Sequence, residues 1–134
     1  MAITHVTALR TDFANLATGT VTTFAAGASQ KIVIYSGTPP ANASAALAGN
    51  TAISTITVLV WGAGATGVAT LTGSTADTAA VGGTASFYRR TQTAGGVIEQ
   101  GLCGLSGSDM NLSSLTIVAG ANVSIPSGSY TASP

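Results

Sequence analysis

The spacing of apolar residues changes once along the chain, near Gly19. Before this point, apolar residues follow one another at intervals of three, four and three positions, which is the spacing of one helix face: Val6, Leu9, Phe13 and Leu16. Thr4 or Thr7 is available as the N-cap. The segment 1–18 is therefore predicted to contain one short amphipathic helix.

After Gly19 the chain consists of short runs rich in β-branched residues, separated by glycine, proline and small polar residues. Strands are predicted at KIVIYSG (31–37), STITVLVW (54–61), GVATLTG (67–73), ASFYRRT (85–91), GVIEQGLCG (96–104), NLSSLTIV (111–118) and NVSIPSGSYTA (122–132). Strands at this spacing with glycine-rich turns favour antiparallel pairing over alternating βαβ units. We expect one mainly β domain over 1–134, with the helical segment first and an antiparallel β-sandwich or barrel-like fold over 19–134.

Two segments between these strands are expected to be loops. The first, PPANASAALAGN, runs from Pro39 to Asn50, and its alanines are also compatible with a helical turn. The second, STADTAAVGG (74–83), has the small polar composition of loops that contact partners.

The chain carries very little charge. Only 6% of its 134 residues are charged and the formal net charge is zero, against roughly 25% charged residues in typical soluble domains. No basic patch is available for nucleic acid, and there is neither an apolar run of about 18 residues nor a signal-peptide pattern at the N-terminus. A surface with so few charges is weakly protected against association, which favours a protein held against partners in an assembly.

The most suggestive motif is WGAGATG, in which Gly62, Gly64 and Gly67 satisfy G-x-G-x-x-G. A dinucleotide site needs a helix after these glycines and an acidic residue about 20 positions later. The following VATLTGST reads as a strand, and Asp77 comes too early and Glu99 too late. The motif is interpreted as a glycine-rich connection between strands.

Catalytic chemistry has few candidate residues here. His5 is the sole histidine and lies in a terminal segment, and Cys103 is the sole cysteine, best read as a small buried residue. The stretch 104–108 departs from a nucleophile elbow because serine stands where the closing glycine belongs. One histidine and one cysteine cannot form a structural zinc site, and Asp109 with Asn111 offers too few oxygens for calcium. We expect a non-enzymatic protein with no catalytic residues, cofactor or metal.

The charged stretch GTASFYRRTQTAGGVIEQG (83–101) contains two arginines and the only glutamate. Strand alternation places Phe87 and Arg89 on one face and Tyr88 and Arg90 on the other, but it does not show which face is buried.

The partner of Glu99 depends on the turn between the two strands. If Gly95-Gly96 forms a two-residue turn, Gln92 faces Glu99 and Arg90 lies diagonally from it. The charges would then form an exposed salt bridge worth well under about 1 kcal/mol. The alternative is a polar contact with a neighbouring subunit.

Several segments together resemble a family of small virion proteins of tailed bacteriophages and prophages. The matching segments are LRTDFANLATG (9–19), KIVIYSGTPPA (31–41), GAGATGVATLTG (62–73), GTASFYRRTQTAGGVIEQGLCGLSGSDMNL (83–112) and IVAGANVSIPSGSYT (117–131). The most characteristic pieces are IYSGTPPA and GTASFYR. The family usually has an acidic residue followed by glycine after the hairpin, and Glu99-Gln100-Gly101 departs from this by an inserted glutamine.

This resemblance implies a decoration or cement protein on the outer surface of the phage head, made in the host cytoplasm. It would bind the major capsid protein near local symmetry axes, as a homo-oligomer with a trimer favoured. Partner contacts are expected from the N-terminal segment and the two loops, with these candidate residues: His5, Pro39, Pro40, Asp77, Arg89 and Arg90.

Two alternatives remain at this point. A tail, baseplate or head–tail connector protein would share the same virion features. A secreted carbohydrate-binding adhesion module belongs to another class, and the absence of a signal-peptide pattern and the 5% aromatic content count against it.

Overall fold

The computed structural model describes residues 3–5, 7, 30–61, 68–78, 80–92 and 96–131. The helix predicted through Leu9, Phe13 and Leu16 lies outside these residues, as does the glycine motif at 62–67. The strand that follows this motif begins at Val68. Since a strand stands where a nucleotide-binding fold needs a helix, the interpretation of the motif as a strand connection is supported.

Ten strands make up the described part of the chain. They are β1 (Thr4–His5), β2 (Gln30–Ser36), β3 (Thr51–Trp61), β4 (Val68–Thr75), β5 (Gly83–Thr84), β6 (Phe87–Gln92), β7 (Val97–Gly104), β8 (Met110–Asn111), β9 (Thr116–Ile117) and β10 (Gly128–Thr131). The mainly β prediction is confirmed, and the five predicted strands between 31 and 104 occur within a few residues of their predicted ends.

The two predicted strands nearest the C-terminus are much shorter than expected. The segment 111–118 splits into β8 and β9 around a bend, where the Ser114 hydroxyl accepts from the Thr116 N–H at 3.1 Å. In 122–132, Val123 forms only an isolated bridge and regular pairing starts at Gly128. Pro126 lies between these points and has no N–H to donate to a ladder.

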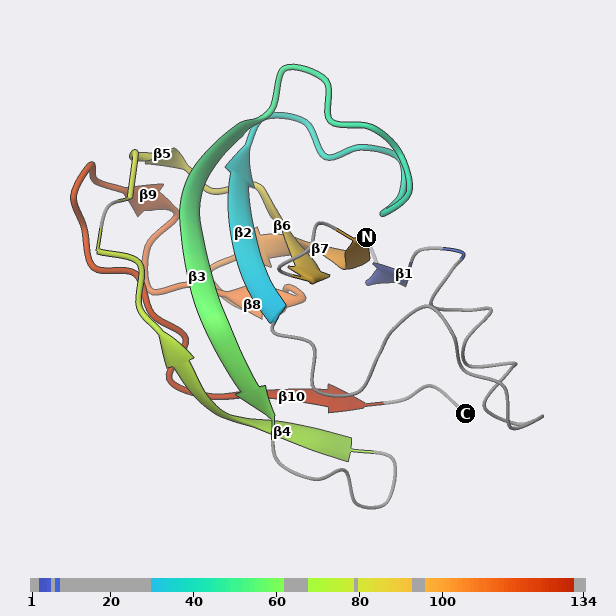
Figure 1. Cartoon of the computed structure of the whole chain (residues 1–134). Coiled ribbons are helices and arrows are strands. Elements are labelled where there is room, and N and C mark those ends of the chain that lie inside the picture. The colour runs from blue at the N-terminus through green and yellow to red at the C-terminus, as the bar shows by residue number, and fades with distance from the viewer. Residues whose placement is uncertain are drawn as a thin grey trace.

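Eight of the strands form one curled sheet in the order β1-β7-β6-β2-β3-β4-β10, with β8 beside β7. Figure 1 shows how β3 bends so that the sheet curves around like half a barrel. A separate two-stranded ribbon consists of β5 and β9. Of the two predicted folds, the described residues thus agree with the barrel-like one, as a curled sheet forming half a barrel, and do not confirm a sandwich of two packed sheets. The pairing is antiparallel as expected, except that β8 runs parallel to β7.

The main core lies on the concave face of this sheet. Ile34 of β2 pairs with Tyr88 of β6, and both side chains are buried there. The other buried members of this cluster are Ile32, Ile53, Ile56, Leu59, Leu71, Ala80, Ala85 and Ile117. Because side chains alternate along a strand, the neighbours of Ile34 and Tyr88 within β2 and β6 point to the opposite, convex face of the sheet.

The convex face of the sheet is also buried where β2, β6 and β7 meet. Val33 pairs with Arg89 and Tyr35 pairs with Phe87, and the Tyr35 and Phe87 rings stack with centroids 5.1 Å apart. The first five residues of β6 are buried in succession. The charged hairpin therefore crosses the interior of the molecule and not its surface.

Candidate functional site

The hairpin of β6 and β7 sets the positions of the charged residues. Arg90 pairs directly with Glu99, and the register shifts by one residue before Thr91 pairs with Val97. The Gln92 N–H donates to the Gly96 carbonyl at 2.8 Å. The register expected from a Gly95-Gly96 turn, with Gln92 opposite Glu99, is therefore wrong, because the strands already pair as Thr91 with Val97 next to the turn. A bulge at Ile98 then brings Glu99 opposite Arg90.

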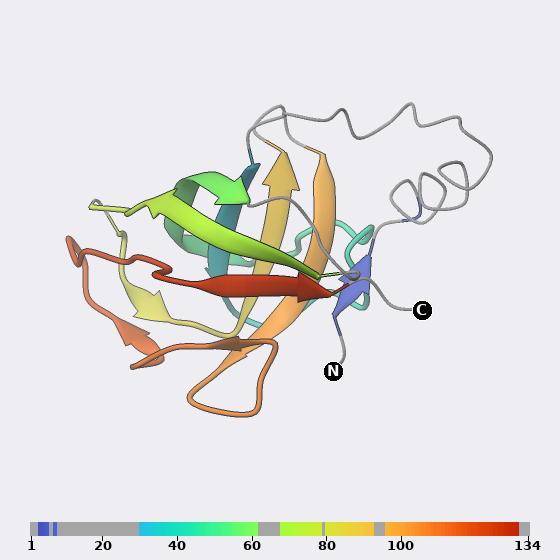
Figure 2. The same cartoon turned by 90° about the horizontal axis from the view of Figure 1, so that it is seen from below.

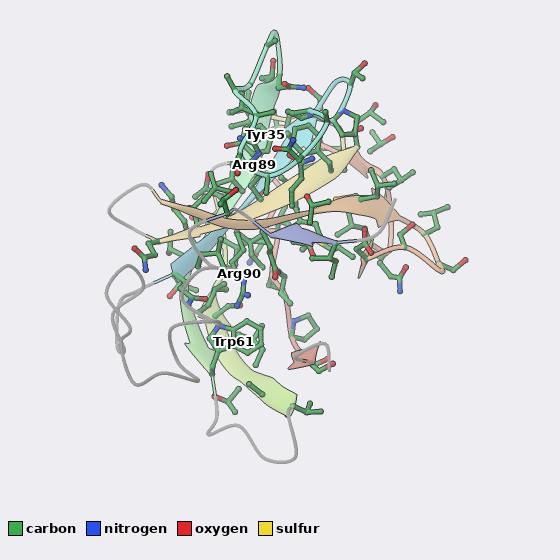
Figure 3. The ribbon with its side chains drawn as sticks, turned by 90° about the vertical axis from the view of Figure 1, so that its right-hand side faces the viewer. Tyr35, Trp61, Arg89 and Arg90 are labelled. Carbon is green, nitrogen blue, oxygen red and sulfur yellow. The ribbon has the colours of Figure 1, made fainter. Side chains whose placement is uncertain are left out.

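On the concave face, Arg90 forms an ion pair with Glu99, with 3.0 Å between Nη2 and Oε2. The two side chains are only 8% and 7% exposed, so the interpretation as an exposed salt bridge is wrong. Arg90 Nη1 also donates to Gln30 Oε1 at 3.2 Å, and its guanidinium lies 5.2 Å from the centre of the Trp61 ring. Figure 3 shows Arg90 and Trp61 together on this side.

On the convex face, Arg89 holds different partners. Its Nε donates to Gln100 Oε1 at 2.9 Å and its Nη2 donates to the Ala45 carbonyl at 2.7 Å. Gln100 is fully buried and donates in turn to the Pro40 carbonyl at 2.9 Å. Burial lowers the pKa of Arg89 and raises that of the nearby Tyr35. Figure 3 shows Arg89 and Tyr35 together, on the other side of the strands from Arg90.

These contacts fasten the loop 37–50 onto the convex face. Within the loop, Asn42 Oδ1 accepts from the Ser44 and Ala45 N–H groups, and Asn50 Nδ2 donates to the Thr38 carbonyl at 2.9 Å. The segment is a turn-rich loop without a helix, so of the two interpretations left open the loop is correct. Ala43, within this loop, is buried.

The remaining predicted contact residues lie in different places. Pro39 and Pro40 are half-buried in the loop 37–50. Asp77 Oδ2 accepts from Ser54 Oγ and the Thr55 N–H, both at 2.8 Å, and its backbone forms a bridge with Val123. His5 lies in β1 opposite Glu99 in the register. The structure thus links Pro40 to Arg89 through Gln100 and places His5 opposite Glu99 in the register. Asp77 instead bonds to residues of β3.

The burial of both arginines was missed by the sequence reasoning. Arg89 and Arg90 are 5% and 6% exposed, and their described hydrogen bonds are made within the chain. A signal was present, because the predicted strand 85–91 has large apolar or aromatic residues on both faces. Their proposed contact with a neighbouring subunit stays a prediction.

A cavity of about 430 Å³ opens on the concave side. Trp61, Leu71 and Ile32 form its apolar wall, while Tyr88, Arg90 and Glu99 add polar groups. Its other side consists of residues 109–112 and 124–129. The cavity therefore lies where the half-barrel is open, between the β8 region and the segment leading into β10.

Two titratable side chains of the core region, Tyr88 and Cys103, keep their protons at neutral pH. Burial raises the pKa of the Tyr88 hydroxyl, and Glu99 and Asp109 raise it further. Burial, with a smaller effect of Asp109, raises the pKa of the Cys103 thiol to about 12. Both groups are therefore neutral at pH 7. Among the residues that the structure describes, no three histidine, cysteine or acidic side chains gather as a metal site would require.

The surface has an unusual distribution of charge. Six charged residues lie in the described part: Lys31, Asp77, Arg89, Arg90, Glu99 and Asp109. Each of these six is buried or half-buried. The exposed surface of the described residues is accordingly built from serine, threonine, alanine, glycine, asparagine and a few apolar side chains.

Exposed apolar residues gather at the ribbon of β5 and β9. Val81 and Val118 are 66% and 67% exposed, and they flank the same end of the ribbon, since Val81 precedes β5, Val118 follows β9 and Gly83 pairs with Ile117. Gly82 has φ +90 and passes so close to Ala119 that an added Cβ would lie 2.7 Å from its nitrogen. Figure 1 shows this ribbon at one end of the molecule, beside β3. We call Val81 and Val118 the ribbon tip.

No protein-family model matches the chain, and no similar curated protein or solved structure was found. Within the described residues, no helix has the length and apolar character needed to cross a membrane.

Proposed function

We propose that this chain is a non-enzymatic structural protein of a tailed-phage virion, acting as a decoration or cement protein on the outside of the head. The sequence resemblance described above supplies the class. The arrangement of charge supports the same role, and it is the structural observation on which the proposal mainly depends.

The argument from charge is physical. A protein that circulates alone at high concentration usually exposes lysine, arginine and acidic side chains, whose repulsion and hydration prevent association. Here none of the described charged residues is fully exposed, and the ribbon tip exposes two valines. Such a surface is suited to permanent contact with other subunits.

Cementing requires only binding. A protein that binds the assembled shell, and not its separated subunits, stabilises the shell by its binding free energy. Many small contacts repeated over a lattice then add up, because neighbouring copies are held at high effective concentration. The partner in this proposal is the major capsid protein, and the chain acts as a homo-oligomer on the capsid surface.

A cement protein must also be stiff enough to transmit this binding energy. The internal contacts of Arg89 and Arg90 serve this need, since they tie β2, β6 and β7 to the loop 37–50 on one face and to β3 on the other. We propose the loop 37–50 and the ribbon tip as the contact surfaces, because they expose the apolar side chains of Leu47, Val81 and Val118.

The test is the copy number of the chain in purified particles, measured by quantitative mass spectrometry against the most abundant shell protein. One copy per shell subunit, or one per three, is the expected result. A count of a few to a few dozen per particle would instead favour the tail, baseplate or connector. Absence from particles would overturn the virion proposal.

The contact surfaces need a separate test. The double variant Val81→Ser with Val118→Ser should bind purified shells more weakly than the unmodified chain in a co-sedimentation assay. A control at the other exposed leucine, Leu105→Ser, lies outside both proposed surfaces and should bind normally. Equal binding by all three proteins would exclude the ribbon tip as the contact.

A further inference from the structure

The two edges of the eight-stranded sheet differ in how their backbone groups are used. At one edge, the outer side of β7 is occupied at several positions: Gln100 and Glu99 pair with β1, and Cys103 and Gly104 pair with β8. Between these pairs, Asp109 Oδ2 accepts from the Leu102 N–H at 2.8 Å. Short segments and a side chain thus use many of the outer backbone groups of β7.

The opposite edge is β10, which pairs with β4 on one side only among the described strands. Its partners run from Gly128 opposite Leu71 to Thr131 opposite Val68. Figure 2 shows β10 lying along the open side of the half-barrel, next to β4. Alternate N–H and C=O groups of these four residues face away from the sheet.

Natural proteins usually protect such an edge with charged side chains, proline or a bulge. The four residues of β10, Gly-Ser-Tyr-Thr, contain no charge and no proline, and the register of β10 with β4 is regular. Neither Thr70 nor Ser129, which are exposed and opposite one another, is charged. The β10 edge therefore lacks three of these protections, namely charge, proline and a bulge, and is protected mainly by its short length of four residues.

We infer that the free edge of β10 pairs antiparallel with the β10 edge of a second copy of this chain. An antiparallel pair of identical strands has two-fold symmetry, so each copy offers the other the same donors and acceptors. The scarcity of exposed charge in the described residues removes the repulsion that would otherwise oppose contact between identical surfaces. This inference concerns self-association and does not depend on the proposed virion role.

The pair is expected to be weak in isolation. Four residues on each side bury much less than the roughly 1,200 Å² of a stable interface, so a Kd on the order of 100 µM is expected. On a lattice, the same contact would gain strength from the high local concentration of copies. A two-fold contact gives dimers, in place of the trimer favoured by the resemblance.

The experiment measures self-association of the full chain by sedimentation velocity, from about 10 µM to about 1 mM. The variants Ser129→Lys and Ser129→Glu each place like charges close to one another across the two-fold axis. Each variant alone should raise the Kd of the dimer by about fivefold. An equimolar mixture of the two should restore it, which also shows that both variants are folded.

Ser44→Lys and Ser44→Glu are matched controls, because Ser44 is an exposed serine in the loop 37–50. They should dimerise like the unmodified chain. A chain that stays monomeric at about 1 mM, a trimer insensitive to charge at position 129, or a mixture that fails to restore dimers would each overturn the inference. Copy number in particles is measured independently, so failure here leaves the virion proposal standing, and the reverse also holds.

Discussion

Arg89 and Arg90 are adjacent in the sequence but belong to different environments. Arg89 lies on the convex face and bonds to neutral groups of Gln100 and the loop 37–50, whereas Arg90 lies on the concave face and pairs with Glu99. A buried guanidinium must have its donors satisfied, since a lost partner leaves an uncompensated charge. Each arginine therefore fixes the position of the segments that surround it.

Removing one partner of the Arg90–Glu99 pair should be much worse than removing both. Arg90→Met is expected to destabilise the chain by about 3 kcal/mol, because Glu99 keeps its buried charge but loses the guanidinium that compensates it. The double variant Arg90→Met with Glu99→Leu should recover most of this loss, since a buried pair can often be replaced by apolar side chains. Urea denaturation measures the free energy of unfolding of the two variants. A double variant no more stable than Arg90→Met would contradict the argument.

Alkaline pH should weaken the fold through Tyr88 and Cys103. The folded chain raises the pKa of the Cys103 thiol from 9.0 to about 12 and also raises that of Tyr88 above 10.0. Both groups hold their protons more tightly when folded, so their stabilisation is fully present below pH 9.0 and is lost as the pH rises toward about 12. The urea midpoint should fall steadily over that range.

Two variants separate these contributions. Tyr88→Phe and Cys103→Ala should each show a shallower fall of the urea midpoint with pH than the unmodified chain, and the double variant the shallowest. A midpoint that is constant up to about pH 11 in the unmodified chain would show that neither group is buried as described.

At the scale of elements, the sequence predicted the central strands well and the C-terminal ones poorly. The runs at 31–37 and 54–61 are long and β-branched, and they form β2 and β3 as expected. The run 111–118 has a similar composition, but it forms two short strands because it turns between β7 and the ribbon. Which segments find a partner strand is decided by contacts distant in the chain.

The loop 37–50 is an element whose position depends on Arg89. Arg89→Lys keeps the charge but loses the planar fork that reaches Gln100 and Ala45 together. We expect a loss of about 2 kcal/mol in stability and faster hydrogen exchange at the loop amides. Lys31→Arg, which changes a cation on the neighbouring strand β2, should leave exchange in the loop unchanged. Equal exchange in both variants would contradict the role of Arg89.

Gly101 is a second position where one element restricts another. A Cβ at this position would lie 2.7 Å from Tyr88 Cε1 and 2.8 Å from Asp109 Cβ. Gly101→Ala should therefore destabilise the chain by about 2 kcal/mol or more through overpacking. Gly73→Ala is the matched control, because Gly73 also lies in a strand and an added Cβ meets nothing within 4 Å. Thermal unfolding of the two variants should separate them clearly.

At the scale of the whole molecule, none of the charged residues that the structure describes is fully exposed: three are buried and three are half-buried. In most proteins, lysine, arginine and acidic side chains remain largely exposed to solvent. The consequence is a surface whose contacts depend on shape and apolar burial, with little long-range steering. A virion component, added once to a fixed lattice, can function with such a surface.

Binding to shells should accordingly be nearly independent of salt. Raising sodium chloride from about 0.05 M to about 0.5 M shortens the screening length severalfold, which weakens interactions between exposed charges. With no fully exposed charge in the described residues, shell affinity should change by less than about twofold. A tenfold loss in co-sedimentation would show that charges outside the described part dominate the contact.

The sequence by itself determined the secondary-structure class, the scarcity of charge and the two faces of the charged strand. These follow from local rules: β-branched runs form strands, and neighbours alternate in direction along them. Only the tertiary structure decided that both faces are buried, that Arg90 meets Glu99 across a bulged hairpin, and that one curled sheet forms with β10 at its open edge. Burial, register and strand order depend on residues far apart in the chain, such as Arg89 and Ala45, and no local pattern encodes their distance.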